Sequence, residues 1–178
     1  MEKLEFRTLK ANEIECRVGT INENGLTLLL YKDARCDMNI LDETIGCLNW
    51  KREHTRDNAN CIVSIYDENK KEWVSKEDTG KESFNEAEKG LASDSFKRAC
   101  VNWGIGRELY TAPFIYISSD KCTIYKNSKG KLAVKEKFVV SSIKYNQNRE
   151  ICDLQIINNK KDIKNGKAYT IAFEKRSK

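Results

Sequence analysis

The chain has one proline, one histidine and no long apolar run among its 178 residues. No stretch approaches the ~18 consecutive apolar residues that a membrane-spanning helix needs. The first ten residues, MEKLEFRTLK, also lack the basic-then-apolar order of a secretory signal. These absences lead us to expect an intracellular, cytoplasmic protein without a membrane partner.

Close cysteine pairs are absent too, although the chain has seven cysteines. An odd number without close spacing argues against a disulfide framework and against a zinc site. We expect most of them to be small buried apolar residues in a reducing compartment. Because His54 is the only imidazole, we expect it to be a structural residue rather than a metal ligand or part of a catalytic triad.

Motifs that bind nucleotide cofactors are missing as well. The phosphate-binding pattern GxxxxGK[ST] does not occur, and the two glycines of GIGRELY (104–110) follow a helical pattern instead of opening one. The carboxylates Asp67, Glu72, Glu77 and Asp78 are candidates for a nuclease magnesium site, but solubility of a polar hairpin explains them better. We expect no cofactor, no metal and no catalytic site, so the protein is not expected to be an enzyme.

The net charge of +5 is divided unevenly along the chain. Residues 1–110 hold 17 Lys and Arg against 21 Asp and Glu, whereas residues 111–178 hold 15 against 6. The balances are therefore −4 and +9. Such an asymmetry favours a polyanionic partner, although a lysine-rich composition alone would also produce it.

The hydrophobic pattern of the first half predicts a strand pair followed by a helix. Asn24-Gly25 is a turn signal inside 14–31 and precedes the β-like run LTLLLY. Spacings of three and four then predict a helix from the N-cap Asp33 to Gly46, with one apolar side made of Ala34, Met38, Leu41 and Ile45.

Three strands and a long helix follow. Strands are expected at 48–56, 60–66 and 72–79, with the polar hairpin DENKK between the last two. Ser83 and Glu86 fit a capping box that would open the helix. Its buried side is expected to be Ala92, Phe96, Ala99 and Trp103, with an end at Gly104 and a packing reason or a break at Gly90.

Beyond Pro113 the sequence predicts only short strands, at 114–118, 122–126, 137–145, 150–157 and 168–173. The fold class is therefore α+β. We expect an antiparallel β-β-β-α core with a flanking N-terminal strand pair and helix, and a small C-terminal β extension.

The most informative window is SDSFKRACVNWGIGRELY (93–110). On a helix, Lys97 and Arg98 lie on a different side from Phe96 and Trp103, and they span about 100° of the circumference. They suit the rim of a groove that binds phosphates. The alternative is a solvated helix face, with Arg98 paired to Asp94 one turn earlier.

A second basic strip surrounds Trp50. Lys51 and Arg52 follow it directly and Arg56 lies further on, but neighbouring residues on a strand point to opposite faces. Trp50 could stack on a base, although its place between a helix and a strand favours the core.

The segments KDARCDMNILDETIGCLNW (32–50) and EDTGKESFNEAEKGLASDSFKRACVNWGIGRELY (77–110) resemble the single-strand annealing superfamily. This superfamily contains the phage Sak proteins and the eukaryotic Rad "fifty-two" recombination mediator. The similarity covers about residues 14–117, and the phage-like branch is the closer one. The matched features are R-x-x-x-x-x-L-D-E-x-x-G-x-x-x-W, SDSFKRA and W-G-I-G-R-x-L-Y.

The resemblance implies roles for individual residues. Lys97 and Arg98 match the central DNA-contacting pair, and Arg35 matches another basic contact. The hairpin residues Lys70 and Lys71 correspond to a second DNA path. Val101 stands where some eukaryotic members have a third arginine. We include Lys51, Arg52 and Arg107 among the candidate DNA-binding residues, with Arg107 also suited to hold the helix end.

The function implied is ATP-independent binding of single-stranded DNA and annealing of complementary strands in recombination and repair, by a homo-oligomeric ring or filament. Residues 1–117 would form the annealing core and 118–178 a basic extension of the same domain. A phage exonuclease or a host single-strand-binding protein is the expected protein partner, in a bacterium or a phage-infected cell. The alternative is a passive protein that coats single strands or protects DNA ends.

Overall fold

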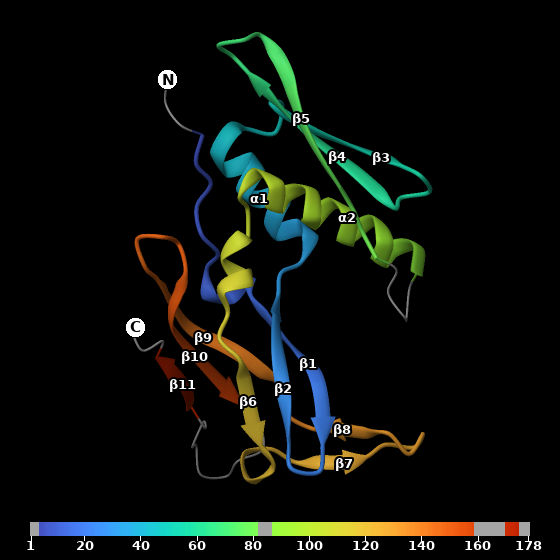
Figure 1. Ribbon diagram of the computed structural model, residues 1–178, viewed down its shortest axis with the longest axis vertical. Coiled ribbons are helices and arrows are strands. Elements are labelled where there is room, and N and C mark those ends of the chain that lie inside the picture. Colours follow the sequence, from blue (N-terminus) through green and yellow to red (C-terminus); the bar gives the residue numbers. More distant parts are fainter. Residues whose placement is uncertain (1–3, 82–86, 159–169, 175–178) are drawn as a thin grey trace. The chain divides into compact units, whose positions relative to one another are not determined.

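The computed structural model describes residues 4–81, 87–158 and 170–174, which form two compact units (Figure 1). The first unit contains residues 4–8 and 33–107, and the second contains residues 9–32 and those from 108 onward. Each unit is therefore built from segments that are far apart in the sequence.

The first unit opens with α1 (Ala34–Ile45), and the sequence sets both of its ends. The Asp33 carboxylate accepts hydrogen bonds from the backbone N–H groups of Arg35 and Cys36, as an N-cap does. Gly46 follows the helix at a φ of 81°, a left-handed value that suits glycine. The predicted helix is confirmed.

The buried side of α1 differs in detail from the predicted one. Leu41 is buried as expected, but Ala34, Met38 and Ile45 are only partly buried. Cys36, Asp37 and Ile40 are buried instead. The buried face of α1 is thus turned by roughly one residue, about 100°, from the face that the apolar spacing predicted. It includes a cysteine and a carboxylate, which the apolar pattern did not count.

A three-stranded antiparallel sheet follows, in the order β3-β4-β5. Its strands are β3 (Trp50–Thr55), β4 (Asn60–Asp67) and β5 (Glu72–Thr79), close to the predicted ranges. The central strand β4 is the most apolar and carries the buried Cys61, Val63 and Ile65. Burial in this strand raises the pKa of the Cys61 thiol to about 11.

The helix α2 (Ala87–Trp103) packs on the face of this sheet that carries these residues, and it also contacts α1. Phe96 and Ala99 are buried as predicted, whereas Ala92 and Trp103 are only partly buried, and Ser95 and Cys100 are buried instead. The helix continues through Gly90 without a break. The predicted capping box at Ser83 and Glu86 lies outside the described residues.

Gly80 lets the chain run from β5 close to α2. A Cβ added at Gly80 would lie 2.5 Å from the backbone nitrogen of Ser95 and 2.9 Å from the carbonyl oxygen of Leu91. Neither backbone atom can rotate away, so only glycine fits this position without moving the helix. The Ser95 hydroxyl adds a hydrogen bond of 3.0 Å to the carbonyl of Asn58.

The second unit contains a six-stranded antiparallel sheet in the order β11-β10-β9-β1-β2-β6. Its strands are β1 (Glu15–Asn22), β2 (Gly25–Tyr31), β6 (Ile115–Ser118), β9 (Phe138–Tyr145), β10 (Ile151–Asn158) and β11 (Thr170–Glu174). The predicted strand pair is confirmed, but its turn lies at Glu23-Asn24, because Asn22 pairs with Gly25. Gly25 starts β2, where a Cβ would meet the carbonyl oxygen of Ile117 at 2.4 Å.

The N-terminal strand pair and the C-terminal extension share this sheet. Glu15 of β1 pairs with Val139 of β9, more than a hundred residues away. A separate hairpin is formed by β7 (Ile124–Lys126) and β8 (Leu132–Val134), of which β8 was not predicted. Short 3-10 turns, at Ala11–Glu13, Arg107–Thr111 and Ser119–Lys121, complete the described elements.

The predicted α+β class with its β-β-β-α core is therefore confirmed. The functional division into a core at 1–117 and an extension at 118–178 stays a prediction. None of the described helices is long and apolar enough to cross a lipid bilayer.

Replacing Gly80 by alanine tests the close approach of β5 and α2. We expect Gly80→Ala to destabilise the protein by about 1–3 kcal/mol, because the new methyl group overpacks against backbone atoms. Urea unfolding followed by circular dichroism measures the change. Ser93→Ala, at an exposed position of the same helix, is the control and should change stability by less than about 0.5 kcal/mol. Equal stability of Gly80→Ala and wild type would contradict the assigned packing.

Candidate nucleic-acid interface

The basic residues that follow Trp50 lie on opposite faces of the three-stranded sheet, as predicted. Lys51 pairs in register with Ser64, whereas Arg52 pairs with the buried Val63. Side chains alternate along a strand, so Arg52 shares the face that α2 covers and Lys51 lies on the other one. The two cations therefore cannot line one groove.

Arg52 belongs to an aromatic cluster on the helix-covered face. Its guanidinium carbon lies 4.8 Å from the ring centroid of Phe96, which stacks on Trp50 at 6.1 Å between centroids. The indole N–H of Trp50 donates to the Asp42 carboxylate at 2.7 Å. These contacts favour the core interpretation of Trp50 over base stacking.

Lys51 lies on the open face of the sheet beside an exposed tryptophan. Its Nζ is 5.0 Å from the ring centroid of Trp73 and 3.6 Å from a carboxylate oxygen of Glu53. Together with Ser64 and Ser75 these residues line a shallow hollow of about 470 Å³. The face combines an aromatic ring with a cation, but the cation is partly compensated by Glu53.

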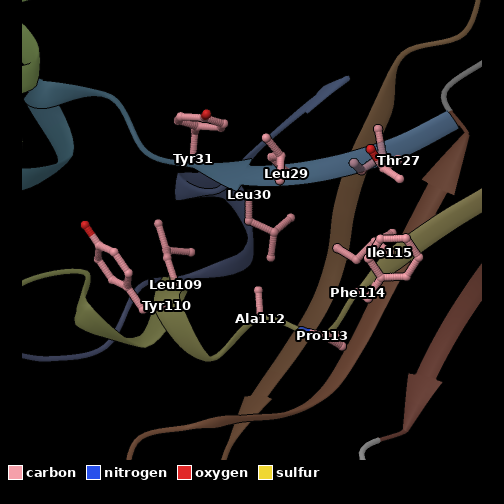
Figure 2. Close-up of a pocket in the computed structure, with 11 residues that line it drawn as sticks. Thr27, Leu29, Leu30, Tyr31, Leu109, Tyr110, Ala112, Pro113, Phe114 and Ile115 are labelled. Carbon is pink, nitrogen blue, oxygen red and sulfur yellow. The ribbon is translucent and has the colours of Figure 1, made fainter. Parts of the chain in front are cut away.

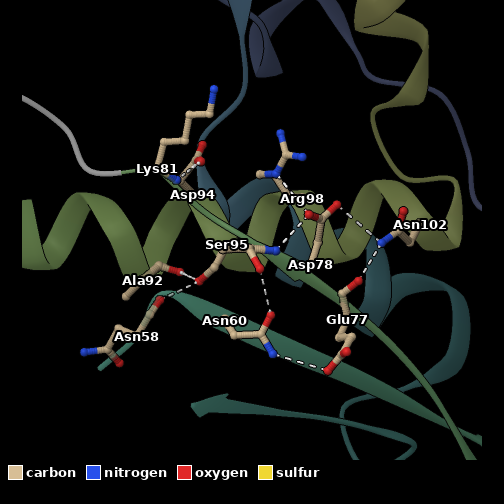
Figure 3. A network of polar contacts seen from close by, with 11 residues as sticks. Asn58, Asn60, Glu77, Asp78, Lys81, Ala92, Asp94, Ser95, Arg98 and Asn102 are labelled. Atoms are coloured by element: carbon tan, nitrogen blue, oxygen red, sulfur yellow. Dashed lines mark hydrogen bonds and ion pairs between the residues drawn. The ribbon is translucent and has the colours of Figure 1, made fainter. Parts of the chain in front are cut away.

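Arg98 is held beside β5 by a network of polar contacts (Figure 3). Its Nε donates to the Asp78 carboxylate at 3.2 Å, and the Arg98 side chain remains 41% exposed. Asn102, one turn further on, donates to the carbonyl of Glu77 at 2.9 Å. The carboxylate of Asp94 accepts instead from the backbone N–H of Lys81 at 2.9 Å. Arg98 thus forms an ion pair with Asp78 of β5, and not with Asp94 as the alternative interpretation supposed.

Lys97 is half-buried and precedes Arg98 on α2. One residue corresponds to about 100° of rotation, so the two side chains leave the helix in clearly different directions. Phe96, the residue before this pair, is buried with 0% of its surface exposed, as predicted. The pair is consequently presented by a helix whose buried face is fixed.

The other candidates on this unit each contact a carboxylate or lie in a tight turn. Arg35 is 82% exposed and lies 2.7 Å from Asp33, and this hydrogen bond holds the pKa of Asp33 below its usual range. Lys70 lies 3.9 Å from both Asp67 and Glu72 in the β4–β5 hairpin. The next residue, Lys71, is exposed and adopts a left-handed φ of 54°.

Arg107 holds the C-terminal end of α2. Its guanidinium donates to the carbonyl of Val101 at 2.9 Å and to that of Asn102 at 3.2 Å. Carbonyls in the last turn of a helix have no partner within the helix, and a cation also interacts favourably with that end of the helix dipole. These bonds agree with the expected structural role of Arg107.

The carboxylates considered for a nuclease magnesium ion do not converge. Asp67 and Glu72 contact Lys70 at the hairpin, and Glu77 accepts a hydrogen bond from Asn60 at 3.2 Å. Asp78 points to the opposite face of β5, where it binds Arg98. Asp67 and Glu72 thus share Lys70 as a neighbour, whereas Glu77 and Asp78 each contact a different residue.

The second unit has an apolar hollow that the sequence did not reveal (Figure 2). Its volume is about 530 Å³, and its walls come from β2 and from the segment that leads into β6. Tyr110 and Phe114 line it and are 71% and 77% exposed. Leu29 of β2, 48% exposed, contributes from the other side. Rings this exposed are typical of a surface that binds a partner.

Residues 1–126 match the family described as Rad52/22 family double-strand break repair protein, which is more than two thirds of the chain. The chain belongs to this family. The match contains all of the first unit and continues through β7, whereas β8–β11 lie beyond it.

Membership of the Rad52/22 family places the protein among those of DNA recombination and repair. At the level of the family, the proteins bind single-stranded DNA, anneal it and form oligomers. No curated protein and no solved structure gives a significant match to the chain.

His54 allows a direct test of the electrostatics around the basic strip. Burial and the neighbouring Arg52 lower the pKa of His54 below 6.5, and its Nδ1 has no hydrogen-bond partner. Because the folded protein resists protonation, His54 should contribute stability above pH 6.5 that is lost as the pH falls toward the lower pKa of the folded state.

NMR titration of labelled histidine measures this pKa directly, since the chain has one histidine. Urea unfolding between pH 5 and 7 should show stability decreasing with falling pH in wild type and less so in His54→Gln. A folded-state pKa at or above 6.5 would contradict the assigned surroundings of the ring.

Proposed function

We propose that this Rad52/22 family member binds single-stranded DNA and anneals complementary strands without ATP. The observation that carries the proposal is the position of Lys97 and Arg98 on α2, inside the segment that matches the family. The helix is fixed through Phe96 and Ala99, and Arg98 keeps 41% of its side chain exposed. A rigid helix with adjacent cations suits a sugar-phosphate backbone, which it binds independently of sequence.

The physical chemistry explains how such a site would promote annealing. Two strands repel each other through their phosphates, and a free strand folds on itself. Cations that neutralise phosphates and extend the backbone reduce both obstacles and leave the bases accessible. Base pairing then supplies the free energy, at about 1.4 kcal/mol per stacked step, so no nucleotide hydrolysis is required.

The ion pairs seen around the site would be exchanged on binding. Exposed ion pairs such as that of Arg35 with Asp33 contribute only about 0–1 kcal/mol, so a phosphate can replace the carboxylate at little cost. Arg98, Arg35, Lys51 and Lys70 all have such carboxylate neighbours. We propose that Lys97 and Arg98 form the central contact and that the others, with Lys71, extend it.

The protein would work as a homo-oligomer. One copy offers few basic contacts, and tight binding of a long strand needs many copies in line, an avidity effect. The apolar hollow of the second unit supports an oligomer. Its exposed side chains, Tyr110, Phe114 and Leu29, form an apolar surface that a neighbouring copy would bury. The resemblance to phage Sak proteins favours a phage-type recombinase whose partners are an exonuclease or a host single-strand-binding protein.

A passive single-strand binder that coats or protects DNA is the second candidate. Both candidates predict salt-sensitive binding, so an affinity measurement does not separate them, whereas an annealing rate does. DNA degradation with and without magnesium tests the nuclease interpretation.

Substitutions of Lys97 and Arg98 test annealing, and a substitution of Asp78, the ion-pair partner of Arg98, is the control. We expect complementary oligonucleotides to pair faster with the protein in the absence of ATP, and Lys97→Ala with Arg98→Ala to reduce this acceleration at least tenfold. Fluorescence energy transfer between labelled strands measures the rate. Asp78→Asn removes the carboxylate beside Arg98 and should leave strand binding unchanged or tighter, because the guanidinium becomes more available to phosphate.

Comparing Asp78→Asn with Arg98→Ala separates a DNA contact of Arg98 from a purely structural role of its ion pair. If Arg98 acted only by fixing β5 to α2, then Asp78→Asn would reduce annealing as Arg98→Ala does. Circular dichroism and urea unfolding establish that each variant is folded. Wild-type annealing by the double variant would contradict the assignment of this site, and a wild type that binds strands without accelerating their pairing would favour the passive binder.

Two substitutions in the apolar hollow test whether it forms the contact between copies. We expect Tyr110→Ser with Phe114→Ser to lower the oligomeric mass measured by light scattering, because two large exposed rings would no longer be buried between copies. Leu48→Ser, at a position that is 87% exposed in the first unit, is the matched control and should leave the mass unchanged. An unchanged mass for the hollow variant would place the contact between copies elsewhere.

A further inference from the structure

The hairpin of β7 and β8 carries the densest positive charge of the described second unit. Between residues 121 and 137 the chain has six lysines and a single acidic residue. All six lysines are exposed: Lys121, Lys126, Lys129, Lys131, Lys135 and Lys137. Glu136 is the acidic residue, and it is only 6% exposed. The exposed charge of this segment is therefore cationic, and the nearest exposed carboxylate is that of Asp120, which precedes Lys121 in the turn before the hairpin.

The buried carboxylate has a structural role at the base of the hairpin. Glu136 accepts hydrogen bonds of 2.8 Å from the backbone N–H and from the hydroxyl of Thr123. These bonds join the two ends of the hairpin. Among the described residues, none of the six lysines is in an ion pair with a carboxylate within 4 Å, in contrast to Arg98, Arg35 and Lys70 of the first unit.

The register places an aromatic ring between two of these lysines. Tyr125 pairs with Ala133, and the hydrogen bonds that flank this pair place Lys135 opposite Thr123 and Lys131 opposite Asn127. Alternate residues of a strand share a face, so Lys131 and Lys135 lie on either side of the ring, about 13 Å apart along the strand. Tyr125, opposite the small Ala133, is 40% exposed. The Nζ of Lys135 lies 5.7 Å from its centroid.

The other face of the hairpin is apolar and anchors it. Ile124, Leu132 and Val134 are partly buried there, and β8 contacts β1 within the same unit. The hairpin is thus two-sided: Lys131, Lys135 and Tyr125 share one face, and the other face is mostly apolar but also carries the exposed Lys126, which pairs with Leu132.

The loop that joins the two strands has a defined shape. The Asn127 side chain accepts hydrogen bonds of 3.0 Å from the backbone N–H groups of both Lys129 and Lys131. Gly130 adopts a left-handed φ of 71°, and its N–H donates to the Asn127 carbonyl. This turn orients the backbone of the loop lysines before any ligand binds, which lowers the entropy cost of binding.

We propose that the β7–β8 hairpin is a second binding site for single-stranded DNA. Lys131 and Lys135 neutralise phosphates on either side of a base that stacks on Tyr125, and Lys129 extends the contact at the loop. Single strands fit this surface better than duplexes, because only an unpaired base presents its face to a ring. The inference rests on the proposed function, but it assigns a site in a different unit and mostly beyond the residues that match the family.

The test measures the binding of a short fluorescent oligonucleotide by the full chain at several salt concentrations. Each lysine that neutralises a phosphate contributes about 0.7 to the slope of log affinity against log salt for a single strand. Lys131→Gln with Lys135→Gln should therefore lower this slope by about 1.4 and weaken binding at low salt on the order of tenfold. Lys10→Gln is the control at an exposed lysine of the same unit, and it should change the slope by much less than the loss of either hairpin lysine.

A substitution of Tyr125 tests the stacking contribution separately from the lysine charges. Tyr125→Leu should weaken binding about fivefold or more through the loss of stacking, while the salt slope stays unchanged. Tyr116→Leu, at a similarly exposed tyrosine of β6, is the control and should bind as wild type does.

The outcomes separate this inference from the proposed function. If wild type binds the strand and the hairpin variants behave like their controls, the hairpin site is wrong while the proposed function stands. If the hairpin variants lose affinity for a duplex but not for a single strand, the ligand assignment is wrong. A wild type that does not bind single strands at all would overturn both.

Discussion

The packing of α2 on one face of the β3–β4–β5 sheet is the constraint on which the candidate site depends. Phe96 and Ala99 are wholly buried, and Gly80 brings the chain so close to the helix that a methyl group does not fit. Well-packed interiors resist displacement, so the helix has one position on the sheet. The directions in which Lys97 and Arg98 leave the helix follow from that position. A flexible basic segment with the same residues would have to be ordered first, at a cost in conformational entropy.

The cations of the two units have different surroundings. In the first unit, Arg98, Arg35, Lys51 and Lys70 each have a carboxylate within 4 Å. In the proposed function a phosphate replaces these carboxylates, so binding should be sensitive to salt. On the β7–β8 hairpin, no such ion pair occurs among the described residues, and the Glu136 carboxylate beside Lys135 and Lys137 is buried.

Local sequence signals predicted most of the first unit. The spacing of apolar residues gave α1 and α2, and polar turns gave the β4–β5 hairpin. Such signals are reliable because they reflect contacts between near neighbours. The opposite orientation of Lys51 and Arg52 followed from the two-residue period of a strand alone. The ion pair of Arg98 with Asp78 could not be predicted in the same way, because it joins residues twenty positions apart and the nearer Asp94 was the obvious partner.

The sequence by itself determined the helices, most strands, the family and the residues that carry positive charge, since each of these depends on residue type and local spacing. Tertiary structure decided which segments share a sheet, such as β1 with β9, and which charges are compensated. It also brought Tyr110 and Phe114 to one hollow with Leu29, and it placed the Tyr125 ring between two lysines. These features depend on pairing between distant parts of the chain, where the geometry of the packed elements decides the neighbour and no local pattern records it.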